Sequence, residues 1–271
     1  MRNSQTQPAG LKSLLELMSQ ETAGATPSAH LPASIRAVLA RPVSWFRESA
    51  AQAGTATAGE PLTNVAFVLD CSGSMETGKE ATIEGFNTQV DVVRRGAALA
   101  GPTTFTDVRF ATTVEVRRVA ASLDHLTPLS DDTYRPDGYT ALYDAVGDTV
   151  AALLETARID EPTTGTLVTV FTDGEENHSR RYTAPLLRAL IERLEATGRW
   201  TFALVGPRDT VGTLADMLAV DQTNVAGFDP ASVADRCAAF TQVAQASAAY
   251  MSVRASGKTA AKNLYAGKKK G

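Results

Sequence analysis

The sequence has few cysteines and no long run of apolar residues. Cys71 and Cys237 are the only two cysteines in 271 residues, which is too few for a disulfide framework, so we expect both thiols to be reduced. No window approaches the roughly 18 consecutive apolar residues that a transmembrane helix needs. The opening residues, MRNSQTQPAG, also lack the apolar stretch of a secretory signal. These absences argue against a membrane span and predict a cytoplasmic protein.

Basic charge is scarce over most of the chain. The formal net charge is −4, and residues 51–253 hold 15 basic and 27 acidic residues. An acidic surface repels phosphates, so the charge of residues 51–253 disfavours nucleic acid as a partner and favours the binding of cations. Residues 254–271 hold six basic residues and no acidic ones. We expect them to form a flexible, solubilising tail, with docking on an acidic partner, a membrane surface or nucleic acid as the alternative.

Strand-like and helix-like segments alternate from residue 62 onward. The apolar runs NVAFVLD (64–70) and TLVTVFTD (166–173) predict buried strands, and the amphipathic stretch 79–99 predicts a helix. The segments 105–111 and 114–119 are separated by two residues, which predicts an antiparallel hairpin because a parallel crossover needs a longer connection.

This alternation predicts an α/β fold: a doubly wound, mostly parallel central sheet with helices on both faces and one antiparallel edge strand. We assign residues 62–253 to this domain and residues 254–271 to the basic tail. Residues 1–61 form an N-terminal helical arm and linker, with short helices expected near residues 11–18 and 35–39.

Hard oxygen ligands collect in three predicted loops. The first strand ends in Asp70-Cys71-Ser72-Gly73-Ser74, a middle loop holds Gly138-Tyr139-Thr140, and the central strand ends in Thr172-Asp173-Gly174. In open α/β sheets, ligands bind at the carboxyl ends of the strands, where these loops are expected to lie. Mg²⁺ prefers six oxygen ligands and keeps several waters, so a few hydroxyls and carboxylates suffice to hold it.

Together these motifs resemble those of the von Willebrand factor type A (VWA) domain. Its metal-ion-dependent adhesion site (MIDAS) combines a DxSxS motif, a loop threonine and a later aspartate. The resemblance covers about residues 63–249 and is similar in style to the bacterial and phage cytoplasmic group, which reads FVLDxSGSM, GFN, GxTALxDA and LTDGxEN. The matching segments here are 67–75, 85–87, 138–145 and 171–177.

The resemblance implies a function as well as a fold. It implies a non-enzymatic module that binds a protein partner through Mg²⁺ or Mn²⁺, with a partner Asp or Glu carboxylate filling an open position on the ion. Direct ligands would be Ser72, Ser74 and Thr140, while Asp70 and Asp173 would act mainly through water. Cytoplasmic bacterial relatives tend to work with ATPase chaperones or in stress and phage-related systems, so an ATPase chaperone is a candidate partner.

A nucleotide-binding or hydrolysing enzyme is the alternative from a different class. Residues 73–79 read GSMETGK, which matches GxxxxGK after a strand and before a helix. A P-loop needs Ser or Thr next, but Glu80 stands there, and Glu76 would place a carboxylate in the phosphate cradle. A structural domain with a vestigial ion site is a third possibility.

Four residues in or next to these motifs have ordinary expected roles. Cys71 occupies the variable position of DxSxS and is expected to point away from the metal. His178 is expected on the rim of the site as a solvated loop residue, and Glu175 and Glu176 are expected to be solvated too.

Overall fold

The computed structural model describes residues 30–44, 61–156 and 161–265. Six strands of this part form one sheet in the order β3-β2-β1-β4-β5-β6. The strands are β1 (Leu62–Asp70), β2 (Thr103–Phe110), β3 (Val114–Ser122), β4 (Thr164–Phe171), β5 (Trp200–Pro207) and β6 (Val225–Phe228). The helices are α2 (Ala33–Leu39), α4 (Lys79–Ala100), α5 (Leu142–Thr156), α6 (Ala184–Ala196), α7 (Val211–Leu218) and α8 (Val233–Ala255), with 3-10 turns at Gly73–Glu76, Leu123–His125 and Gln222–Asn224.

The predicted fold class is confirmed by the strand pairing. β1 lies in the middle and pairs in parallel with both β2 and β4, and β5 and β6 continue the parallel sheet. β3 pairs antiparallel with β2, as the short connection between them requires. The chain therefore leaves β1 toward one side of the sheet and returns through β4 on the other. A change of direction of this kind opens a crevice at the carboxyl ends of the two strands.

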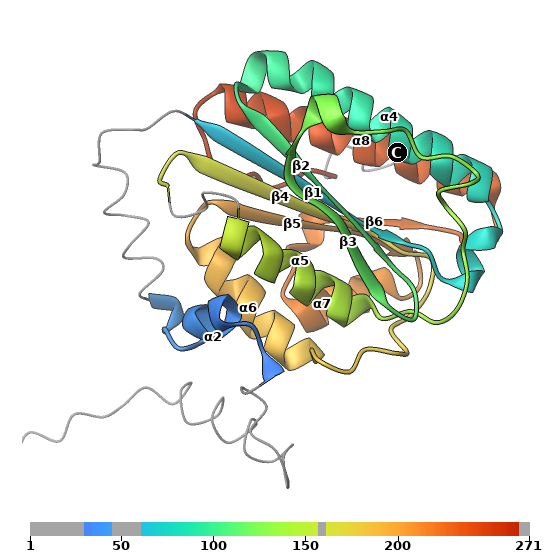
Figure 1. Ribbon diagram of the computed structural model, residues 1–271, viewed down its shortest axis with the longest axis horizontal. Coiled ribbons are helices and arrows are strands. Elements are labelled where there is room, and N and C mark those ends of the chain that lie inside the picture. Colours follow the sequence, from blue (N-terminus) through green and yellow to red (C-terminus); the bar gives the residue numbers. More distant parts are fainter. Residues whose placement is uncertain (1–29, 45–60, 157–160, 266–271) are drawn as a thin grey trace, which may run out of the picture.

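Helices cover both faces of the sheet, with α4 and α8 on one face and α5, α6 and α7 on the other (Figure 1). Side chains of β1 alternate between the two layers because successive residues of a strand point to opposite faces. Val65, Phe67 and Leu69 join the core under α4 and α8, whereas Ala66 and Val68 join the core under α5 and α6. All nine residues of β1 are buried, so its carboxyl end is held firmly.

The N-terminal helix expected near residues 35–39 is present as α2. It packs on α5 and α6, and its Ile35 is fully buried in their core. Residues 33–39 thus belong to the folded body instead of a separate arm. The helix expected near residues 11–18 and most of the expected linker lie outside the described residues.

The expected flexible tail does not begin at residue 254. Helix α8 runs to Ala255, and the chain then passes the amino ends of β4 and β5 and continues to Tyr265. The backbone N–H of Ala261 donates to Thr201 Oγ1 at 2.9 Å, and that of Tyr265 donates to Thr223 O at 3.0 Å. The prediction was wrong for residues 254–265, because these hydrogen bonds and the packing of Ala261, Leu264 and Tyr265 against the core hold the segment in place without any periodic apolar pattern. The terminal lysines lie outside the described residues.

Within the residues described, no helix is long and apolar enough to cross a membrane.

Candidate metal centre

Asp70 forms the floor of the site at the end of β1. Its side chain is fully buried; Oδ1 accepts from the Ser72 backbone N–H at 2.7 Å, and Oδ2 accepts from Thr172 Oγ1 at 2.5 Å. Burial raises the pKa of Asp70 from 3.8 to about 6, because the surrounding protein solvates a carboxylate poorly. The two hydrogen bonds offset part of this effect. A cation above Asp70 would compensate its buried charge.

Two serine hydroxyls connect Asp70 to the second carboxylate. Ser72 Oγ and Ser74 Oγ lie 3.2 Å apart, and Ser74 Oγ donates to Asp173 Oδ1 at 2.6 Å. Ser72 is buried, whereas Ser74 is exposed at the surface. The hydroxyls and carboxylates at the ends of β1 and β4 therefore form one continuous group of oxygens that reaches solvent.

Thr140 adds a further hydroxyl from the loop before α5. Its N–H donates to Asn177 Oδ1 at 2.8 Å, and its carbonyl accepts from the Asn177 and His178 N–H groups at 3.1 and 3.2 Å. A Cβ added to Gly174 would lie 3.5 Å from Thr140 Oγ1 and 3.6 Å from Ser74 Oγ. The glycine thus leaves open a small space that both hydroxyls border. The structure brings all five predicted residues together: Asp70, Ser72, Ser74, Thr140 and Asp173.

A divalent cation with a preference for oxygen fits this donor set. The group contains two carboxylates and three hydroxyls, and oxygen-rich sites of this kind suit Mg²⁺ or Mn²⁺ more than thiolates or imidazoles would. Among the described residues, no group of three or more His, Cys, Asp or Glu is placed to hold a metal ion. The hydroxyl-containing group is therefore the candidate centre in this part of the chain.

Glu176 is not the solvated residue that the sequence suggested. Its Oε1 accepts from the N–H groups of His178 and Ser179 at 2.8 and 2.6 Å, and its Oε2 accepts from the Tyr143 N–H at 2.9 Å. One carboxylate thereby ties the loop after β4 to the start of α5. Glu175, by contrast, is exposed as expected.

Asp144 anchors the same loop further along the chain. It accepts hydrogen bonds from the backbone N–H groups of Arg180, Arg181 and Tyr182 at 2.9–3.1 Å. Neither Asp144 nor Glu176 stood out in the sequence as a bracing residue, because the contacts that join α5 to the loop after β4 involve backbone N–H groups more than thirty residues away. The motif letters GxTALxDA and TDGxEN, which include them, were the available signal.

Arg236 is the most consequential residue that the sequence did not reveal. It lies near the start of α8, is 1% exposed, and its Nη2 is 2.8 Å from Asp173 Oδ2. Asp173 therefore contacts a hydroxyl with one oxygen and a buried guanidinium with the other. No motif marks an arginine 63 residues after the aspartate that it binds.

An aromatic pair stands on the rim of the site. The rings of Tyr139 and His178 stack with centroids 5.2 Å apart and planes 10° apart. Tyr139 is 61% exposed and directly precedes Thr140. A molecule bound at the oxygen group would meet this stacked surface.

Cys71 points away from the oxygen group, as expected, and its Sγ donates to Arg135 O at 3.3 Å. Burial raises the pKa of its thiol, which disfavours the reactive thiolate.

The GxxxxGK segment does not have an open phosphate cradle. Residues 73–76 form a 3-10 turn, and Met75 within it is fully buried in the core. Lys79 Nζ lies 2.6 Å from Asp131 Oδ1, so the lysine that would bind phosphate is paired with an acid.

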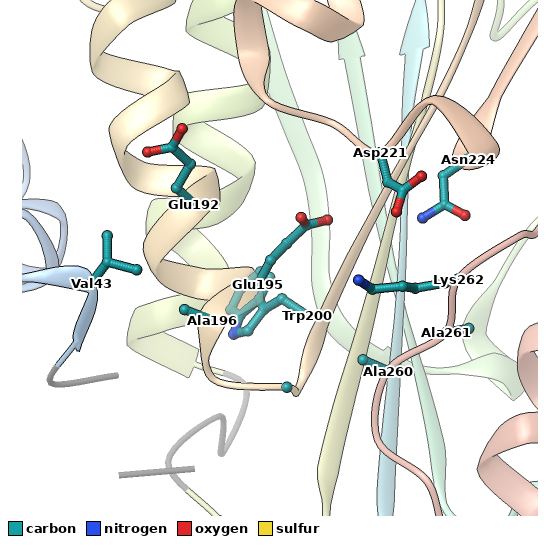
Figure 2. A pocket seen from close by; sticks show the side chains of 11 residues that line it. Val43, Glu192, Glu195, Ala196, Trp200, Asp221, Asn224, Ala260, Ala261 and Lys262 are labelled. Carbon is teal, nitrogen blue, oxygen red and sulfur yellow. The ribbon is translucent and has the colours of Figure 1, made fainter. Parts of the chain in front are cut away.

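A pocket of about 730 Å³ lies at the opposite, amino-terminal end of the sheet, beside Trp200 (Figure 2). Glu195, Asp221 and Lys262 direct their charged groups toward it, and burial raises the pKa of Glu195 to about 7. None of the five predicted metal residues lines this pocket.

Comparison with known proteins is informative at the level of structure only. No family model and no curated protein matches the chain. The SpaC pilus adhesin from Lactobacillus rhamnosus GG in its open conformation gives a TM-score of 0.51 at 12% identity, over 72% of this chain and 31% of that chain. A von Willebrand factor type A structure from Catenulispora acidiphila gives a TM-score of 0.43 at 20% identity, over 72% of this chain and 44% of that chain.

Proximal thread matrix protein 1 from the mussel byssus, with a zinc-occupied MIDAS motif, gives a TM-score of 0.46 at 15% identity, over 70% of this chain and 49% of that chain. The chain spans less than half the length of these three matched structures. At 12% identity, the likeness to the SpaC adhesin concerns the fold alone.

Proposed function

We propose that this chain is a VWA-type module that binds a protein partner through a divalent cation, Mg²⁺ or Mn²⁺. The observation that carries the proposal is the convergence of three separate loops on one group of oxygens at the switch point of the sheet. Ser72, Ser74 and Thr140 would hold the ion directly, and Asp70 and Asp173 would act through water. The bound ion would supply an electrophilic position for a carboxylate oxygen of the partner.

The chain's own residues prepare this position in three ways. Thr172 and the Ser72 N–H fix the Asp70 carboxylate, and Asn177 fixes the Thr140 backbone. Ser74 lies at the surface, where a partner can reach it. The stacked Tyr139 and His178 rings offer an apolar and polarisable contact for residues that flank the partner's carboxylate.

We further propose that the module binds without catalysing a reaction, that it acts in the cytoplasm of a bacterium, and that an ATPase chaperone is a candidate partner. These points come from the sequence resemblance. Nucleotide binding has no specific observation in its favour, because Lys79 and Met75 are engaged within the fold.

The first test measures Mn²⁺ binding by electron paramagnetic resonance. Thr140→Val removes one proposed ligand while keeping the shape of the side chain, and we expect binding to weaken by tenfold or more, on the order of one lost metal ligand. Thr149→Val is the matched control: Thr149 is also buried, but its hydroxyl donates to Ala145 O inside α5. Equal Mn²⁺ affinities in the two variants would contradict the proposal.

The second test asks whether the ion connects the chain to a protein. Wild type in Mg²⁺, wild type in EDTA and Thr140→Val in Mg²⁺ are compared in capture experiments, with Thr149→Val again as the control. We expect a specific partner to be retained only by wild type and Thr149→Val in Mg²⁺. A partner retained equally in EDTA would show that the metal centre is not the interface.

A further inference from the structure

Arg236 places a permanent positive charge directly beneath the candidate metal centre. Its guanidinium and the Asp173 carboxylate form an ion pair in which both side chains are 1% exposed. Burial of this kind removes both groups from water and keeps their interaction strong. Arg236 is therefore a fixed component of the site, unlike a surface arginine.

The surrounding fold holds the guanidinium in one position. Nη1 lies 3.1 Å from the Met75 sulfur, and the group stands over the Phe228 ring with its central carbon 5.4 Å from the ring centroid. The Nε of Arg236 is buried without a hydrogen-bond partner. A larger residue at Gly78 would not fit, since an added Cβ there would lie 2.7 Å from that Nε. The turn after β1, which carries Ser72 and Ser74, thus packs directly against Arg236.

A count of charges shows what this arrangement does. Asp70 and Asp173 bring two negative charges, and Arg236 cancels one of them. A divalent cation then leaves the buried site with one net positive charge, and a partner carboxylate brings the total to zero. Without Arg236, the cation alone would already neutralise the two aspartates, and a further carboxylate would add an unbalanced negative charge.

We infer that Arg236 makes cation binding and carboxylate binding depend on each other. It weakens the hold on the cation when no anion is present and favours the state in which both are bound. The coupling is reciprocal: whatever factor the anion adds to cation affinity, the cation adds to anion affinity. This inference rests on the proposed function and assigns Arg236 a positioning and charge-balancing role without contact to the partner.

The test compares Mn²⁺ affinities, measured by electron paramagnetic resonance, in chloride and in acetate at equal ionic strength, with correction for Mn²⁺–acetate complexes. Arg236→Met removes the charge and keeps an apolar chain beside Met75 and Phe228. In chloride we expect it to bind Mn²⁺ about tenfold more tightly than wild type, within the usual range of coupling factors. Acetate should tighten Mn²⁺ binding by wild type and have less effect on Arg236→Met.

Two controls separate charge from packing. Arg236→Lys keeps the positive charge and should bind Mn²⁺ with nearly the wild-type affinity. Arg254→Met removes another buried arginine of α8, one that donates to Leu62 O and Thr163 O at the far end of the sheet. It should lower stability without changing the affinity for Mn²⁺.

The outcomes distinguish this inference from the proposed function. If Arg236→Met and wild type bind Mn²⁺ equally in chloride, the inference about Arg236 is wrong. The proposed metal centre still stands in that case, provided that Thr140→Val binds Mn²⁺ more weakly than wild type. If Arg236→Met does not fold, identical Mn²⁺ affinities of wild type in acetate and in chloride still overturn the inference, and Arg236→Lys with an unchanged response to acetate supports it. If wild type and Thr140→Val take up Mn²⁺ equally, the proposed function itself fails.

Discussion

Replacing Gly85 by alanine should destabilise the protein, although the substitution favours helices in general. Gly85 faces α8, and a Cβ added there would lie 2.1 Å from Phe240 Cγ and 2.5 Å from both Cδ atoms. The Phe240 ring cannot move aside easily, because it is 3% exposed and stacks on Phe171 with centroids 4.1 Å apart. The two helices therefore need a residue without a side chain at this crossing.

Two opposing effects set the change in the free energy of unfolding that Gly85→Ala should cause. Overpacking of a rigid core costs about 1–3 kcal/mol, with a contact this short at the upper end. Alanine also favours the helix by about 1 kcal/mol relative to glycine, which offsets part of this cost. We expect Gly85→Ala to lower the free energy of unfolding by about 2 kcal/mol.

The assay is urea unfolding followed by circular dichroism, with Gly212→Ala as the matched control. Gly212 also lies in a helix, α7, but an added Cβ would have only Gln222 Oε1 near it, at 3.9 Å. That variant should gain about 0.5–1 kcal/mol. The reasoning is refuted if Gly85→Ala is as stable as wild type, or if both variants lose stability alike.

Three further predictions concern other parts of the fold. Burial raises the pKa of Glu195 from 4.5 to about 7, so the folded state holds this proton more tightly than the unfolded state and stability falls as the pH rises between those values. In Glu195→Gln the free energy of unfolding should fall by roughly 2 kcal/mol less between about pH 5 and about pH 8, as measured by urea unfolding. An unchanged pH dependence would show that Glu195 is not the cause. Asp144→Asn should cost about 1–3 kcal/mol in thermal unfolding, because it weakens three hydrogen bonds from backbone N–H groups. A disulfide reagent should modify exposed Cys237 well before half-buried Cys71, and mass spectrometry of peptides would reveal the reverse order.

The strands and their order of appearance were predictable because burial on both faces of a sheet leaves continuous apolar runs in the sequence. Val65 to Leu69 show such a run, and the structure buries all of it. The edge hairpin was predictable from the length of its connection alone. The short segment 254–265 was misjudged because it is held by hydrogen bonds and a few apolar contacts to distant elements, and these leave no periodic pattern in the sequence.

The sequence by itself determined which residues stand at the carboxyl ends of β1 and β4, since Asp70 ends one recognisable strand and Asp173 closely follows another. Only the tertiary structure decided what surrounds them. The ion pair of Arg236 with Asp173, the bracing by Glu176 and Asp144, and the position of Thr140 beside Ser74 all join segments far apart in the chain. The local pattern of apolar residues indicates which side of its own strand or helix a residue faces. The partner of a buried charge, however, is set only when separate elements pack together.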